Sequence, residues 1–388
     1  MPTAPQEPRA PFNLHAEMQR FWIRVSEGME IRELWSQFEK DARSGYRFYS
    51  VGLAAQVEGK SGFSRAWAVA KTLFWAILEK LSPARRVLLL FALVFLFLPT
   101  SAITVSDHPG QVRIVEFEPH FWGGLLLLIV LLLELADRVV MKRDLEIAKD
   151  IQTWLLPGAP LQLPGYALAY ATRPANTVAG DYYDVILRPG ETRADDRVLL
   201  VVADVAGKSI PAAMLMATFQ ASLRTLSGTG ASLAKLVTGL NHYACTNSQG
   251  GTRFTTAFLA ELDPSTGHMI YVNAGHNAPL LRRESVLEHL NVGGPPLGIS
   301  EEFTYEVGAA DLQPGDWLVI FTDGVVEAVN ASGQEYEEPR LIQVVQDGAA
   351  KSPADLLRLL LSSLDAFVGN TPQHDDMTCL LIKRTASS

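Results

Sequence analysis

Residues 198–208 read Val-Leu-Leu-Val-Val-Ala-Asp-Val-Ala-Gly-Lys. The apolar run over 198–203 has no polar interruption and is typical of a β-strand. It ends at Asp204, and Gly207 and Lys208 follow before the next apolar segment. The stretch therefore predicts a strand that carries a carboxylate to its end.

Other strand-like runs are bounded by acids in the same way. These acids are Asp181 and Asp184 around the start of the run over 182–187, Asp323 after the run over 317–322, and Asp375 and Asp376 before the run over 377–382. Carboxylates that converge repel one another unless cations neutralise them, and oxygen-only ligands favour hard ions such as Mg2+ or Mn2+. Taken singly, an Asp beside a Gly is more typical of a turn. Spacing alone leaves a metal site and a set of turns both open.

The pattern around these acids indicates the fold class. Between Leu161 and Arg384, strand-like runs come as neighbours, with helical patterns in pairs between them. This order favours an α+β fold over a regular βαβ repeat. The predicted strands are 166–171, 182–187, 198–203, 254–262, 269–273, 286–290, 317–321 and 378–382, and the predicted helices are 210–226, 232–246, 339–348 and 353–368.

Composition and missing motifs exclude several classes of protein. A net charge of −9 argues against a nucleic-acid binder, which would carry basic patches. Cys245 and Cys379 are too few for a disulfide framework or a thiolate zinc site, and neither has the spacing to arginine of a cysteine phosphatase. The segment at Lys208-Ser209 lacks the leading glycine of a P-loop, because Val202 stands at that position.

Two apolar segments precede the strand-rich region and predict a transmembrane hairpin over 85–137. The first, Val87–Val105, has no charged residue, and the second, Phe121–Ala136, has one, Glu134. Basic residues flank both outer ends, which predicts a cytoplasmic location for both termini. The expected location is thus the inner (cytoplasmic) membrane, as a multi-pass protein with its C-terminal domain in the cytoplasm. Two buried helices of a soluble domain are the alternative.

The remaining parts of the chain divide by pattern. Residues 1–84 read as a cytoplasmic, largely helical N-terminal region with no recognisable sensor motif. Residues 138–156 read as a linker helix with an apolar face that includes Ile151 and Leu155, and Pro157 ends it. Residues 157–388 form the expected C-terminal domain. The linker could transmit a movement, act as an inert spacer or pair with a second copy.

The stretch from 148 to 383 resembles the SpoIIE/RsbU group of protein phosphatase 2C-like (PPM) serine phosphatases. The matching pieces are Ala-Lys-Asp-Ile-Gln at 148–152, Leu-Leu-Pro at 155–157, Val-Ala-Gly-Asp-Tyr-Tyr-Asp at 178–184, Asp-Val-Ala-Gly-Lys at 204–208, Asn-Ala-Gly-His-Asn at 273–277, Pro-Leu-Gly at 296–298, Phe-Thr-Asp-Gly-Val at 321–325 and Asp-Asp-Met-Thr at 375–378. Ala179 and Ser209 stand where this group often has glycine. His276 is a candidate general acid or a structural hydrogen-bonding residue.

The resemblance implies a fold of two stacked antiparallel sheets with helices outside and a cleft that holds two Mn2+ or Mg2+ ions. Carried over by position, Asp181 and Asp204 bind the paired ions with help from the carbonyl of Val205, and Asp323 and Asp375 complete the set. Asp376 and Asp184 are the alternatives within their acid pairs. Ile151 and Leu155 mark the helix that switches activity in such proteins.

The resemblance also implies a function. It is metal-dependent hydrolysis of phosphoserine or phosphothreonine on a partner protein by a water that two metal ions activate, without a phosphoenzyme. By kinship the substrate is a phosphorylated anti-sigma-factor antagonist, and the protein is a membrane-tethered homodimer in signal transduction. The alternatives are a catalytically silent membrane scaffold and a hydrolase of a small phosphate ester.

Overall fold

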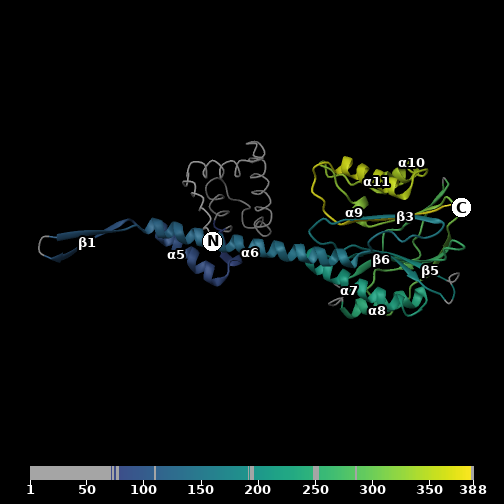
Figure 1. Ribbon diagram of the computed structural model, residues 1–388, viewed down its shortest axis with the longest axis horizontal. Helices are drawn as coiled ribbons and strands as arrows, with labels where there is room; N and C mark the ends of the chain where they lie inside the picture. Colours follow the sequence, from purple (N-terminus) through teal and green to yellow (C-terminus); the bar gives the residue numbers. More distant parts are fainter. Residues whose placement is uncertain are drawn as a thin grey trace, which may run out of the picture. The chain divides into compact units, whose positions relative to one another are not determined.

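A computed structural model of the 388-residue chain describes residues 71, 74–75, 78–108, 111–190, 192, 196–247, 253–284 and 286–385, with backbone alone for 101–117. The chain divides into two compact units, Met1–Asp137 and Arg138–Ser388 (Figure 1). Most of the predicted N-terminal region 1–84, including its expected helices, lies outside the described residues.

The larger sheet of the second unit is built around β5, the strand predicted from residues 198–203. β5 pairs antiparallel with β4 and β6, β6 pairs with β7, and the short strands β10 and β11 both pair with β7. The bounds are β4 Tyr182–Arg188, β5 Arg197–Val205, β6 Thr255–Leu262, β7 His268–Ala274, β10 Gly293–Gly294 and β11 Gly308–Asp311. Residues 198–203 are at most 1% exposed, which agrees with their apolar character.

The second sheet has five strands in the order β3-β13-β12-β8-β9, and all its pairings are antiparallel. The bounds are β3 Tyr166–Arg173, β8 Leu280–Arg283, β9 Val286–His289, β12 Trp317–Phe321 and β13 Met377–Arg384. β12 and β13 lie side by side, so the acids that follow β12 and precede β13 come to one end of this sheet.

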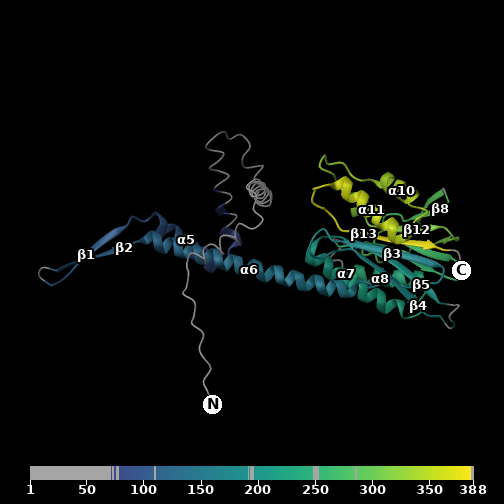
Figure 2. The same ribbon diagram turned by 45° about the horizontal axis from the view of Figure 1, so that its top comes forward.

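Helices cover the outer faces of the two sheets, as Figure 2 shows. The bounds are α7 Ser209–Ser227, α8 Leu233–Asn247, α9 Asp323–Val326, α10 Glu338–Asp347 and α11 Pro353–Val368. α7 and α8 pack on the six-stranded sheet, while α10 and α11 pack on the five-stranded one. The predicted α+β arrangement of two stacked sheets flanked by helices is confirmed, and β8, β10, β11 and α9 add elements that the sequence patterns did not single out.

Alternate residues of β5 serve two cores, because successive side chains of a strand point to opposite faces. Leu199 and Val201 pack toward α7 and α8, whereas Leu200 and Val202 pack against the five-stranded sheet. Asp204 continues the second series, so its carboxylate points to the side on which the two sheets face each other.

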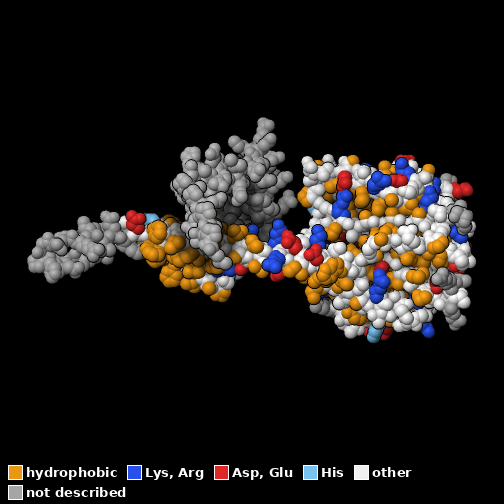
Figure 3. Space-filling view, in the orientation of Figure 1, with side chains coloured by type: hydrophobic (Ala, Val, Ile, Leu, Met, Phe, Trp, Pro, Cys, Tyr) orange, Lys and Arg blue, Asp and Glu red, His pale blue; other side chains and the backbone are white. Residues whose placement is uncertain are grey.

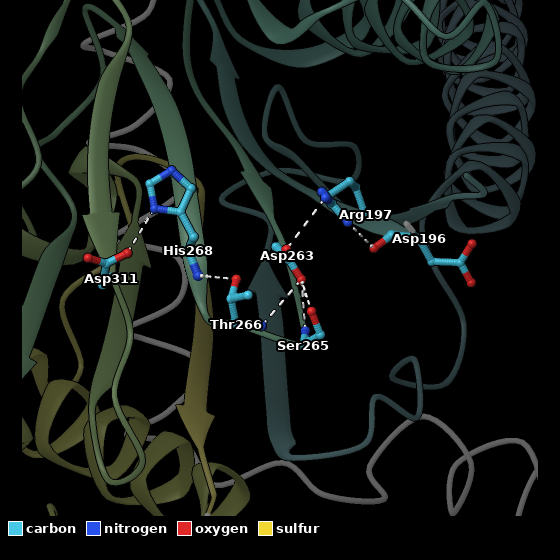
Figure 4. Close-up of polar contacts among 7 residues, drawn as sticks. All are labelled: Asp196, Arg197, Asp263, Ser265, Thr266, His268 and Asp311. Carbon is cyan, nitrogen blue, oxygen red and sulfur yellow. Dashed lines mark hydrogen bonds and ion pairs between the residues drawn. The ribbon is translucent and has the colours of Figure 1, made fainter. Parts of the chain in front are cut away.

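A polar turn closes the end of the six-stranded sheet that lies away from Asp204 (Figure 4). Arg197, the first residue of β5, pairs with Asp263 at 3.4 Å, and the Asp263 carboxylate accepts hydrogen bonds from the backbone amides of Ser265 and Thr266. Burial alone would raise the pKa of Asp263, but these hydrogen bonds hold it below its usual value. These contacts stabilise a turn, so the cluster has a structural role. It lies about 24 Å along β5 from Asp204, at ~3.4 Å per residue.

The first unit differs from the predicted transmembrane hairpin over 85–137. Its elements are α5 Pro83–Phe97, β1 Ser101–His108, β2 Gln111–Phe117 and the first part of α6 Pro119–Leu155. Pro99 follows α5, and the β-branched residues Ile103, Thr104 and Val105 favour a strand, so the apolar run splits into a helix and a strand. Most of the segment between the two apolar runs belongs to the β1–β2 hairpin.

The lengths of the apolar helical segments do not support the predicted transmembrane hairpin over 85–137. α5 has 15 residues, about 22 Å at ~1.5 Å per residue, short of the ~30 Å of a bilayer core. The uncharged run of α6 that starts at Phe121 ends before Glu134, after about 20 Å. Among the described residues, no helix meets the combined length and hydropathy that a membrane crossing requires.

α5 and the first part of α6 nevertheless pack closely and carry many exposed apolar side chains, which Figure 3 shows gathered over these helices. A Cβ on Gly123 would lie 2.9 Å from the carbonyl oxygen of Ala92, so glycine permits the close approach. Arg85 pairs with Glu134 at 3.2 Å and with Asp137 at 2.6 Å. The charge inside the second apolar run is therefore neutralised within the helical pair.

Candidate metal and phosphate site

Asp204 lies where the two sheets meet at one end. It is the last but one residue of β5, and its backbone pairs with Thr256 of β6. Burial, followed by the charges of Asp323 and Asp375, raises the pKa of Asp204 to about 7. Burial is the larger cause, and the nearby carboxylates add to it because a like charge disfavours the ionised form of Asp204.

Asp181 reaches the same place from the residue before β4. Its side chain is 2% exposed, and burial and then the charge of Asp204 raise its pKa well above the usual value. Gly180 brings the two segments together: a Cβ there would lie 3.0 Å from the carbonyl oxygen of Val205 and 3.7 Å from Asp204 Oδ1. Glycine is thus required for close approach of the β4 entry to the end of β5.

Thr322 links the two sheets at this end. Its hydroxyl donates to Asp181 Oδ2 at 2.8 Å and accepts from the backbone amide of Thr378 at 2.9 Å. The side chain is fully buried, so both partners fix its rotamer. Thr322 therefore ties the end of β12 and the start of β13 to the acid that precedes β4.

Asp323 opens α9 immediately after Thr322. Burial and then the charge of Asp375 raise its pKa. The next residue, Gly324, packs against the backbone before β13, and a Cβ at that position would overlap the carbonyl oxygen of Asp376. This contact holds the β12–α9 junction against the loop that carries the last two acids.

Asp375 and Asp376 are adjacent in the sequence but have different partners. Both oxygens of Asp376 accept backbone hydrogen bonds, from Ala175 N and from Gly180 N, each at 2.6 Å. Asp375 is more open, with its side chain 38% exposed, and pairs with Lys208 at 2.9 Å. Asp376 anchors the loop before Asp181, while Asp375 Oδ1 accepts a hydrogen bond from the amide of Asp376.

Asp184 lies apart from the other acids. It is three residues after Asp181, and strand alternation places it on the same face as Tyr182, toward α7. Its carboxylate is fully buried, pairs with Arg224 at 2.7 Å and accepts a hydrogen bond from the Tyr182 hydroxyl. These partners neutralise its charge, so we leave Asp184 out of the ligand set.

The donor chemistry of the remaining acids suits hard divalent cations. Asp181, Asp204, Asp323 and Asp375 supply only carboxylate oxygens, and the charges of Asp323 and Asp375 add to burial in raising the pKa of Asp204. In the described part of the chain, no three His, Cys, Asp or Glu side chains are placed to enclose a single ion. The four acids therefore lie near one another without surrounding one point, and the Asp375 carboxylate is turned to Lys208.

His276 does not have the properties of a general acid at neutral pH. Its side chain is buried, and its Nδ1 lies 3.0 Å from the Thr256 hydroxyl. Burial lowers its pKa to about 4, and the backbone carbonyl of Phe321 offsets only part of that effect. The imidazole is therefore neutral at pH 7 and serves as a hydrogen-bonding residue between β6 and the loop after β7.

The linker helix contacts the site through a residue that its apolar pattern did not single out. Gln152 of α6 donates its Nε2 to Ala179 O at 2.7 Å and accepts from Ala179 N at 2.9 Å. Of the predicted switch positions, Ile151 is 49% exposed and Leu155 is partly buried. The methyl group of Ala179, where the related group often has glycine, is accommodated in a buried position.

Comparison with known proteins agrees with this architecture. The chain is 27% identical over 246 residues to the phosphoserine phosphatase RsbU of Bacillus subtilis, covering 63% of this chain and 71% of RsbU. It is 25% identical over 272 residues to protein IcfG of Synechocystis sp., covering 63% of this chain but 42% of IcfG. The match therefore spans less than half the length of IcfG.

A solved structure shares the fold. The SiaA-PP2C domain of Pseudomonas aeruginosa superimposes with a TM-score of 0.55 and 20% sequence identity, covering 64% of this chain and 98% of that domain. Residues 194–385 match the family model described as stage II sporulation protein E (SpoIIE). The chain therefore carries a PP2C-like phosphatase domain of the SpoIIE family.

Proposed function

We propose that this protein is a metal-dependent phosphatase that hydrolyses phosphoserine or phosphothreonine on a partner protein. The observation that carries the proposal is the convergence of carboxylates from four distant segments, with burial and mutual repulsion raising the pKa of Asp204 to about 7. Such an arrangement is costly in the free protein and is compensated by bound cations. The names of relatives such as RsbU point to the same reaction.

In this proposal Asp181, Asp204, Asp323 and Asp375 hold two divalent ions, Mn2+ or Mg2+, with help from the carbonyl of Val205. Ions held there would supply a water of lowered pKa near the phosphorus atom. The protein's own contribution is rigid placement. Thr322 fixes one oxygen of Asp181, and Asp376 holds the loop that leads into it.

The substrate is proposed as a phosphorylated signalling protein of the anti-sigma-factor antagonist class, on kinship alone. We also propose that the protein acts as a homodimer. Ile147, Ile151 and Trp154 form a stripe on α6 at helical spacing, and all three are exposed, Trp154 by 81%. A second copy of the same helix would cover this stripe.

Turnover with a defined metal tests the proposal. The full chain, freed of metal and then supplied with Mn2+, is expected to release phosphate from a phosphoserine protein faster than from free phosphoserine. Asp204→Asn should abolish release while the fold is retained by circular dichroism. Binding of Mn2+ without any turnover would favour a catalytically silent scaffold, and equal rates on both substrates would favour a hydrolase of small phosphate esters.

A further inference from the structure

Lys208 sits at the rim of the acid cluster. It is the residue before α7, and its ammonium group reaches across to the loop before β13, where it donates to His374 O at 2.6 Å and pairs with Asp375 Oδ2 at 2.9 Å. Gly207 and Ser209 on either side have positive φ angles of 118° and 64°. From this turn the side chain reaches the loop before β13.

A cavity of about 170 Å³ lies at this rim and is lined by Lys208, Gly324, Glu327, Gln373, His374 and Asp375 among others. A water molecule takes up about 30 Å³ of liquid volume, so the cavity has room for a phosphoryl group. It adjoins the acids directly, because Asp375 belongs to both and Gly324 follows Asp323.

A positively charged side chain at this cavity would offset the repulsion between the carboxylates and a phosphate group. A phosphate monoester is a dianion at neutral pH, and carboxylates at the site repel it. Lys208 brings a compact positive charge of the kind that binds phosphate oxygens, and in the described chain it is the basic side chain paired with this cluster. Its side chain is 54% exposed, so it is free to exchange one partner for another.

Resting on the proposed function, we infer that Lys208 binds the phosphoryl group of the substrate. Its ammonium leaves Asp375 when that carboxylate takes up a divalent ion, and it then donates to a non-bridging oxygen of the phosphate. The present ion pair with Asp375 keeps both side chains in place in the absence of substrate. No bond is made or broken in this exchange.

Calorimetric titration of the Mn2+-loaded full chain with inorganic phosphate tests this assignment without requiring turnover. Lys208→Met removes the charge and keeps the length, and it should weaken phosphate binding at least tenfold, or about 1.4 kcal/mol. Lys208→Arg should restore most of the affinity. Lys235→Met, on the exposed face of α8, is the matched control and should bind phosphate as the wild type does.

Titration of the same variants with Mn2+ separates recognition from a purely structural role. Lys208→Met should bind Mn2+ as tightly as the wild type or more tightly, because no ammonium group competes for Asp375. Unchanged phosphate affinity in Lys208→Met, weaker Mn2+ binding in that variant, or a wild type that binds no phosphate would each overturn the inference. A wild type that binds phosphate through Lys208 but hydrolyses no phosphoprotein would instead refute the proposed function alone.

Discussion

The side chain of Gln152 makes two hydrogen bonds with the backbone of one residue, Ala179, like a neighbouring strand. Nε2 donates to the carbonyl oxygen at 2.7 Å and Oε1 accepts from the amide at 2.9 Å. Ala179 is two residues before Asp181, and Asp376 holds the intervening Gly180 amide. A displacement of α6 along its axis would therefore move the segment that carries an acid of the site.

Replacing Gln152 by Leu should destabilise the domain and weaken its metal site. The change leaves the buried amide and carbonyl of Ala179 without partners, at a cost of about 2–4 kcal/mol. We expect a lower melting temperature and weaker Mn2+ binding in Gln152→Leu. Thr153→Ala is the control, since the Thr153 hydroxyl donates only to Lys149 O within the same helix. Wild-type Mn2+ affinity in Gln152→Leu would show that the contact does not support the site.

Stability without metal should depend on pH through Asp204. Its pKa rises from 3.8 to about 7 on folding. Between pH 3.8 and 7 the Asp204 carboxyl group is therefore protonated in the folded state and ionised in the unfolded state. The resulting stabilisation is fully present below pH 3.8 and is lost as the pH rises through 7. Relative to Asp204→Asn, the metal-free wild type should thus gain stability as the pH falls from 7 toward 4.

Urea unfolding of both proteins in the presence of a chelator measures this difference. His276 contributes in the opposite sense. Its pKa falls to about 4 on folding, so its protonation favours the unfolded state below pH 6.5. This contribution is the same in the wild type and in Asp204→Asn, and it cancels when their free energies of unfolding are subtracted. Saturating Mn2+ should reduce the pH dependence, because bound cations keep the carboxylates ionised. A stability difference that does not change between pH 7 and 5 would contradict a raised pKa for Asp204.

Replacing Gly324 by Ala should disrupt the site through the backbone. The added Cβ would overlap the carbonyl oxygen of Asp376, so the β12–α9 junction or the loop before β13 must shift. We expect a loss of at least about 2 kcal/mol in the free energy of unfolding and weaker Mn2+ binding. Gly228→Ala is the matched control, because its Cβ would lie 3.6 Å from the nearest atom, the carbonyl oxygen of Thr225. Equal stability of the two variants would argue against this contact.

Much of the fold could be predicted because its signals are local. The apolar run at 198–203 and the acids at strand ends mark β5 and its neighbours directly. The prediction of a transmembrane segment over Val87–Val105 is not supported, since hydropathy alone does not weigh Pro99 or the β-branched residues that follow it. Membrane length also requires an uninterrupted helix, which α5 and the apolar part of α6 do not provide.

The parts of the site that escaped prediction depend on contacts between distant segments. Thr322 and Gln152 belong to the matching pieces at 321–325 and 148–152, but their partners, Asp181 and Ala179, are 141 and 27 positions away, so the local sequence does not show what they contact. Asp184 did carry a signal, because it lies inside the predicted strand over 182–187, whereas Asp181 precedes that strand.

The exposed stripe on α6 should mediate dimerisation. Trp154→Glu places a charge in the stripe and should shift the full chain from dimer to monomer in sedimentation equilibrium, while the melting temperature changes little. Thr153→Glu, one position off the stripe, should leave the dimer intact. Sedimentation of the wild type as a monomer at micromolar concentration would contradict dimerisation through this stripe.

The central claim is that Asp181, Asp204, Asp323 and Asp375 act together to bind divalent cations. Titration of the metal-free full chain with Mn2+ by calorimetry tests it most directly, with Asp184→Asn as a control for an acid that pairs with Arg224 instead. The account predicts saturable binding that is lost in Asp204→Asn and in Asp323→Asn and kept in Asp184→Asn. Binding that survives in Asp204→Asn, or no binding by the wild type, would contradict it.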